Sequence, residues 1–119
     1  MNNTYFDQDT YDNEIDLETN EDVLKRIYND GVTPTDELPI EFFFLTDTKV
    51  KADNFRDHLQ EAFPTYQDIE ISDYDDDFEI SGTTHPIKME LKTINDWNST
   101  MWDIGYKFDC RLDGWQVGT

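Results

Sequence analysis

Apolar residues recur at two different periods along the chain, and the first period predicts a helix. Between residues 20 and 30, apolar side chains are spaced three and four positions apart, which places them on one helical face. Gly31 follows and supplies the left-handed residue that ends many helices. We expect Thr19 or Asn20 to cap the first turn.

The segment "IEFFFLTD" is the clearest strand signal. Ile40, Phe42 and Phe44 alternate onto one face of this strand. Phe43 and Leu45 point to the opposite face. Since both faces carry large apolar groups, we predict a central strand that is covered at least partly on each side.

The middle of the chain contains a helix, a hairpin and a second helix. Apolar residues recur at helical spacing from residue 52 to residue 63, and Pro64 ends that helix. Residues 66–80 predict a β-hairpin whose turn is the acidic run "DYDDD". A clean amphipathic stripe over residues 94–108 predicts another helix.

The chain ends in "FDCRLDGWQV", which predicts the last strand. Strict alternation places Cys110 and Leu112 on one side, and Trp115 with its charged neighbours at 111 and 113 on the other. Gly114 would let the strand bulge or let another backbone approach closely. Pairing of this strand would hold a large aromatic that otherwise sits near a fraying end.

The predicted order is helix, strand, helix, strand, strand, helix, strand. The last six elements form the split βαβ pattern of a ferredoxin-like α/β sandwich, an α+β fold. In that topology the first and third strands occupy the middle of a four-stranded antiparallel sheet, and two helices cover one face. We expect the extra N-terminal helix to cover part of the other face, where Phe43 and Leu45 point.

Charge changes this picture most. The 119 residues suffice for one domain, yet they contain 28 acidic against 9 basic residues and carry a net charge of -19. From Asp57 to Ile87 there are nine acids and no Lys or Arg. Such a field repels nucleic-acid phosphate and anionic membranes. We therefore expect a basic protein partner, and no direct binding to nucleic acid or membrane.

Residues 1–19 contain six acids, no Lys or Arg and few large apolar groups. This composition predicts a mobile acidic arm, followed by a single folded domain over residues 20–119. The alternative is an arm that docks on the domain through Tyr5, Phe6 and Tyr11.

Cysteine use and the N-terminus indicate a compartment. Cys110 is the only cysteine, so it permits no internal disulfide and is typical of a buried structural thiol. The first twenty residues lack the basic region and apolar run of a secretory signal. No stretch approaches the roughly 20 apolar residues of a membrane helix. We expect a cytoplasmic protein.

Four segments, in order, resemble segments of the RraB family, the regulators of ribonuclease E activity. "RLDGWQVG" resembles the family's Tyr-Asp-Gly-Trp-Gly signature, and "NEDVLKRIYNDG" its N-terminal helix. "IEFFFLTD" is similar to the first strand, and "ISGTTHPIKMELKTINDW" to the stretch from the third strand to the last helix. The likeness covers about residues 20–119. Leu112 stands where the family usually has Tyr, and Gln116 where it often has Gly.

The resemblance implies a non-catalytic regulator that binds the Arg-rich C-terminal scaffold region of ribonuclease E and restrains RNA decay. An acidic surface suits such a partner, because opposite potentials speed encounter and favour the right partner. Two alternatives stay open. One is an immunity-type inhibitor of a basic nuclease toxin, and the other is a small hydrolase that uses acids near Trp115.

The candidate partner-binding residues form two groups, the hairpin turn and the end of the last strand. Acids in the turn face water and can still dock arginine side chains. Trp115 is either part of the core or an exposed aromatic that makes, with Asp113, a stacking and salt-bridging pocket for arginine. The predicted residues are Asp73, Asp75, Asp76, Asp77, Asp113, Gly114 and Trp115.

Signals for catalysis or metal binding are weak. The run "DYDDD" starts like a calcium loop, but Phe78 stands where the loop needs Gly, and Thr84 where it needs Glu. His58 and His85 lack the spacing of zinc ligands. The sequence has no nucleophile elbow, P-loop or Gly-rich nucleotide motif. We therefore expect no catalytic residues, no metal and no cofactor.

Overall fold

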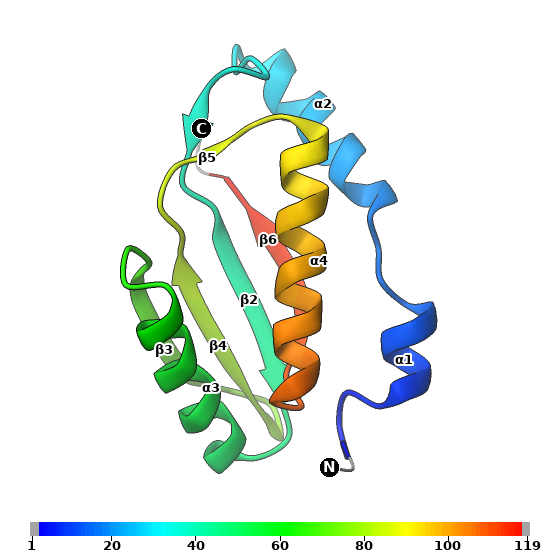
Figure 1. Cartoon of the computed structure of the whole chain (residues 1–119), viewed down its shortest axis with the longest axis vertical. Coiled ribbons are helices and arrows are strands. Elements are labelled where there is room, and N and C mark those ends of the chain that lie inside the picture. The colour runs from blue at the N-terminus through cyan, green and yellow to red at the C-terminus, as the bar shows by residue number, and fades with distance from the viewer. Residues whose placement is uncertain (1–2, 118–119) are drawn as a thin grey trace.

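The computed structural model describes residues 3–117; residues 1–2 of the predicted arm and 118–119 of the predicted domain lie outside this range. Figure 1 shows α3 and α4 lying across one side of a sheet, with α1 and α2 beside α4. The elements are α1 (Gln8–Asn13), α2 (Glu18–Asn29), β1 (Glu37–Leu38), β2 (Glu41–Thr46), α3 (Lys49–Ala62), β3 (Gln67–Tyr74), β4 (Asp77–Thr83), β5 (Ile87–Lys88), α4 (Leu91–Lys107) and β6 (Arg111–Gln116).

The main sheet has four antiparallel strands in the order β3-β4-β2-β6. The predicted first and third strands, β2 and β4, occupy its middle, so the ferredoxin-like α+β fold is confirmed. A second sheet pairs β1 with β5 through two residues each. Strands this short have no readable period, which is why the sequence pattern did not predict them.

One face of the four-stranded sheet makes the core. Phe42 and Phe44 are fully buried there, and Ile80 of β4 lies directly opposite Phe44. Phe55 of α3 packs edge-on against Phe44, with ring centroids 4.6 Å apart. Gly82 belongs to this face because a Cβ there would lie 2.7 Å from the Phe42 ring. The paired aromatics therefore fix how closely the helices approach the sheet.

The opposite face carries no helix in the described part of the chain, and we call it the open sheet face. Phe43 and Leu45 point to this side and make no part of the core cluster. Residues paired directly across an antiparallel sheet share a face, so the registers assign the rest. The open sheet face consists of Glu41, Phe43, Leu45, Glu70, Ser72, Tyr74, Asp77, Glu79, Ser81, Thr83, Arg111, Gly114 and Gln116.

Helix α2 differs from its prediction in start and position. Its N-cap is Leu17, without a side-chain hydrogen bond, whereas Thr19 and Asn20 lie inside the helix. The helix ends as predicted, with Gly31 at φ 102°. Asn20 is buried against Asn98 of α4, so α2 packs beside α4 on the core side. The expectation that it covers the opposite face was wrong.

The N-terminal segment is docked on the domain, unlike the predicted mobile arm. Phe6 is fully buried, and its ring meets Trp102 edge-on at 4.6 Å between centroids. Tyr11 stacks on Tyr106 at 4.3 Å, and its hydroxyl donates a hydrogen bond to Asp103. The alternative of docking through aromatic residues is therefore what the structure shows. The packing of Tyr5, Phe6 and Tyr11 against the core thus holds the segment in place, although its composition is otherwise typical of disorder.

Asp109, just after the end of α4, anchors this N-terminal segment. Its carboxylate accepts hydrogen bonds from the backbone N–H groups of Thr4, Tyr5 and Phe6, and it pairs with Lys51. Burial alone would raise the pKa of Asp109, but the Lys51 ammonium and these N–H donors outweigh it and lower the pKa. Asp109 also has φ 56°, which Asp tolerates better than most residues. One buried carboxylate thus holds the end of α4 and the N-terminal segment together.

Candidate functional site

Strand β6 contains an irregularity that decides where its aromatic residue points. Phe43 pairs with Gly114, whereas the next residue, Phe44, pairs with Leu112, so Asp113 is the extra residue of a β-bulge. The bulge at this glycine confirms the prediction for Gly114. It also turns Trp115 onto the same face as Leu112, opposite Phe42. The strict alternation that placed Trp115 on the other face was therefore wrong.

Trp115 is half-buried at the edge of the core. Its indole meets Trp97 edge-on, with centroids 6.4 Å apart. Its Nε1–H donates a 2.8 Å hydrogen bond to the Asn20 side-chain oxygen, and Asn20 in turn donates to Asn95 and Asn98. The residue ties β6 to α2 and α4, and its remaining surface lines a groove.

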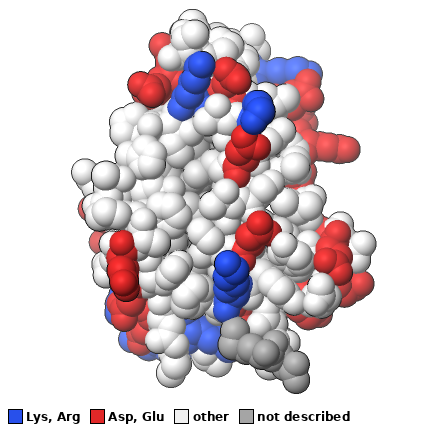
Figure 2. All heavy atoms as spheres, in the orientation of Figure 1, with Lys and Arg blue, Asp and Glu red and all other residues white. Residues whose placement is uncertain are grey.

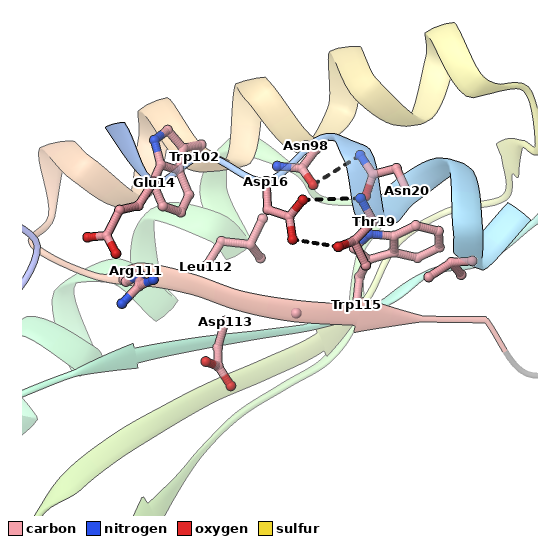
Figure 3. Close-up of a pocket in the computed structure, with 12 residues that line it drawn as sticks. Glu14, Asp16, Thr19, Asn20, Asn98, Trp102, Arg111, Leu112, Asp113 and Trp115 are labelled. Carbon is pink, nitrogen blue, oxygen red and sulfur yellow. Dashed lines mark hydrogen bonds between the residues drawn. The ribbon is translucent and has the colours of Figure 1, made fainter. Parts of the chain in front are cut away.

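This groove, which we call the β6 groove, has a volume of about 240 Å³ and runs between β6, α4 and the start of α2. Figure 3 shows Trp102, Asp16 and Trp115 above the strand, with Asp113 on its other side. Asp113 and Trp115 therefore lie on opposite sides of β6 and do not together enclose one arginine pocket. The groove is lined by Glu14, Asp16, Thr19, Asn20, Val23, Asn98, Trp102, Arg111, Leu112, Asp113, Gly114 and Trp115.

Two charged groups of the β6 groove differ in whether they already have a hydrogen-bond partner. Asp16 accepts hydrogen bonds from the side-chain hydroxyl and backbone N–H of Thr19, which lower the pKa of this carboxyl. Arg111 has a buried Nε without a hydrogen-bond partner, and it makes no ion pair with any residue between 3 and 117. A cation in this position partly offsets the acids beside it.

The predicted hairpin acids lie away from the β6 groove. Asp73 belongs to β3 and Asp77 to β4, and β2 separates both of these strands from β6. Asp75, in the turn between them, has φ 52°. Asp75 and Asp76 are exposed. The structure therefore places Asp113, Gly114 and Trp115 in one strand, with Asp113 and Trp115 on opposite sides of it, and the hairpin acids elsewhere.

Tyr5 links the two groups. Its hydroxyl lies near Asp77 of β4 and near Arg111 and Asp113 of β6. Burial, followed by the Asp77 carboxylate, raises the pKa of Tyr5, although Arg111 opposes this. Leu45, beside these residues on the open sheet face, is 9% exposed. The docked N-terminal segment thus brings Tyr5 within reach of charges at the Leu45 end of that face.

Groups with catalytic or metal-binding chemistry are separated. Cys110 is fully buried, as predicted, and burial raises the pKa of its thiol to about 12, so it is not a thiolate near neutral pH. His58 packs against Phe108, whereas His85 approaches the Thr65 hydroxyl at 3.0 Å. Within residues 3–117, no three His, Cys, Asp or Glu side chains gather as a metal site.

A family model describes this arrangement. The model of RraB, regulator of ribonuclease activity B, matches residues 17–117, which include every strand of both sheets. The chain belongs to the RraB family. A search of curated proteins found no match. Membership identifies a regulator of ribonuclease activity that works through protein–protein interaction, in a regulatory family. Among the described residues, no helix is long and apolar enough to cross a membrane.

Sequence reasoning missed several residues that shape the site of this RraB-family chain. Asn20 was considered only as a helix cap, and its two partners, the half-buried Asn95 and the buried Asn98, lie on α4, more than seventy positions away. Asp109 carried no signal, because a lone acid among 28 is uninformative. Arg111 could have been found, since it is the one basic residue of the strand that carries the predicted contact residues Asp113, Gly114 and Trp115.

Proposed function

We propose that this protein binds a ribonuclease of the ribonuclease E type and lowers its activity, without cleaving RNA itself. The observation that carries the proposal is the family match over residues 17–117. The match supports regulation of a ribonuclease; the type of ribonuclease and the direction of the effect are the parts that we add. We place the complex in the cytoplasm, where RNA decay takes place.

Charge supports a basic contact region on the ribonuclease. The protein carries a net charge of -19, so RNA and RNA-like surfaces are repelled. An arginine-rich segment outside the catalytic domain is the kind of surface that this field attracts. We propose that the hairpin acids and the end of β6 contribute to that contact. These residues are Asp73, Asp75, Asp76, Asp77, Asp113, Gly114 and Trp115.

The side-chain chemistry supports regulation without catalysis. Cys110 is buried and protonated near neutral pH, whereas His58 packs on Phe108 and His85 approaches the Thr65 hydroxyl. In the β6 groove, the Asp16 carboxylate accepts its hydrogen bonds from Thr19, and neither a histidine nor a cysteine lines the groove. The described residues therefore do not show the pairing of a histidine base with a nucleophile that covalent catalysis commonly uses. We therefore assign the effect on RNA decay to binding.

The proposal is tested by binding and inhibition measured together. The purified full chain is mixed with the host's ribonuclease E-type enzyme at low salt, where charge pairing is strongest. We expect a complex, slower cleavage of an RNA substrate, and weaker binding as salt is raised. The chain alone, incubated with the same RNA, is the control and should leave it intact. Absence of a complex at low salt would remove the proposed function.

A further inference from the structure

The open sheet face carries several acids and almost no bases. Every lysine and every arginine except Arg111 lies outside the four strands of the main sheet. Figure 2 shows the opposite side of the molecule, where blue and red residues are interspersed over the helices. The carboxylates on or beside the open sheet face are Glu41, Asp68, Glu70, Asp77, Glu79 and Asp113.

A hollow of about 360 Å³ lies at the Phe43 end of this face. Glu41, Asp68 and Glu70 line it, and all three are exposed. The half-buried Phe43 and Ser81 also line this hollow. An aromatic residue with carboxylates around it offers both a group for stacking and acceptors for N–H donors.

The residue that pairs with Phe43 leaves space beside the hollow. Phe43 pairs across β2 and β6 with Gly114, which has no side chain. No atom outside its own neighbours lies within 4 Å of the position that a Cβ on Gly114 would take. The described chain therefore leaves the space over Gly114, opposite Phe43, empty.

We propose that the Phe43 end of the open sheet face docks an arginine-bearing segment of a basic protein partner. The proposal rests on the proposed function and identifies the surface through which the ribonuclease is held. A guanidinium is planar, stacks on an aromatic ring and donates to carboxylates in a fork, so it satisfies Phe43 and its acidic rim at once. Lysine carries the same charge, but its ammonium group is not planar and does not stack on the ring in this way.

Other occupants fit this face less well. A second copy of the chain would bring two sets of carboxylates together with one arginine from each copy, and such like-charge contact is unfavourable. A nucleic acid would place its phosphates against the same carboxylates. Charge complementarity therefore selects a basic protein segment.

The test compares two variants that each lose three negative charges. The open-face variant is Glu41→Gln, Asp68→Asn and Glu70→Gln. The matched control changes exposed acids of α2 and α3 that make no ion pair among the described residues. The control variant is Glu18→Gln, Asp22→Asn and Glu61→Gln.

Both variants are first checked for folding by thermal melting, and then measured for binding to the ribonuclease at low salt. We expect the open-face variant to bind about tenfold more weakly or worse, and the control within about twofold of the wild type. Equal losses in both variants would show that only the overall field matters, and would overturn the proposal. Unchanged binding of the open-face variant would do the same.

A second arm does not need the ribonuclease and so separates the two proposals. The full chain, labelled with ¹⁵N, is titrated with deca-arginine and with deca-lysine. We expect shifts of backbone amides in residues 41–45 and 79–83, tighter binding of deca-arginine, and loss of that preference in Phe43→Ala. Shifts confined to the helices would contradict the assignment. So would a dimer in sedimentation equilibrium that the open-face variant dissociates.

Discussion

The two faces of the main sheet use the same strand in different ways. On the core side, β2 buries Phe42 and Phe44 completely. On the open sheet face it presents Phe43, which is half-buried and packs against nothing in the core cluster. Neighbouring phenylalanines are thus structural on one side and available on the other. The comparison teaches that the hydrophobic pattern locates a strand but does not say which face is covered.

The helix side and the open sheet face also differ in how their charged residues are paired. On the helix side, Lys25, Lys49 and Lys92 each pair with an acid four positions away. Exposed pairs of this kind contribute little to stability, but they neutralise the field locally. On the open sheet face, Arg111 is the single base on the strands. The open sheet face therefore carries negative charge that is hardly compensated by bases on its own strands.

The largest expected effect contrasts adjacent phenylalanines. Phe44→Ala removes a fully buried ring and should lower the free energy of unfolding by about 3–5 kcal/mol. Phe43→Ala should lower it by only about 1 kcal/mol, because that ring is not part of the core. Urea unfolding of both variants measures the difference. Similar losses would mean that something in the chain covers the open sheet face after all.

The N-terminal anchor gives the next largest effect. Asp109→Asn removes the buried charge from Lys51 and from three backbone donors, and should cost about 3 kcal/mol. The pKa of Asp109 is lowered by folding, so its stabilisation is complete above the unfolded value of about 3.9 and is lost as pH falls through the lower folded value.

The measurement is the free energy of unfolding from pH 3 to pH 7 for the wild type and Asp109→Asn. The two curves should lie apart at neutral pH and converge towards acid pH. Limited proteolysis should cut near residues 3–17 sooner in the variant. Curves that stay parallel down to the lowest pH would mean that this carboxylate is not the anchor.

Part of the architecture was readable from the sequence, and the reason for the failures is specific. The hydrophobic periods of β2, α3 and α4 predicted these elements correctly, because each element buries a continuous stripe of apolar side chains. Trp115 was placed on the wrong face because one bulge residue, Asp113, shifts the alternation, and the glycine marks a bulge without fixing its outcome. The docking of Phe6 depends on Trp102 and Asp109, about a hundred positions away. No local pattern carries such contacts.

A smaller effect is expected at the edge of the core. Trp115→Phe keeps the aromatic contact with Trp97 but removes the N–H donor to Asn20. Because Asn20 is 1% exposed, its oxygen would lose a partner, at a cost of about 1 kcal/mol. Binding to the ribonuclease should change by less than about twofold, because phenylalanine keeps the aromatic ring that Trp115 offers to the partner. A Trp115→Ala variant that binds as tightly as the wild type would remove Trp115 from the proposed contact.

The smallest effect on stability is expected at the hairpin turn. Changing Asp73, Asp75, Asp76 and Asp77 to Asn should alter the free energy of unfolding by no more than about 0.5 kcal/mol, since these side chains are mostly exposed. Association with the ribonuclease should slow by about tenfold at low salt. Stopped-flow mixing at several salt concentrations measures this. A rate equal to that of the wild type would remove the turn from the encounter surface.

The central claim is that a basic ribonuclease segment covers the open sheet face and leaves the helix side free. Hydrogen–deuterium exchange of the full chain, with and without the host ribonuclease, tests it most directly. The account predicts slower exchange in residues 41–45, 67–72 and 79–83, and no change in α3 or in the outer turns of α2. Protection confined to the helices, with the sheet segments unchanged, would contradict it.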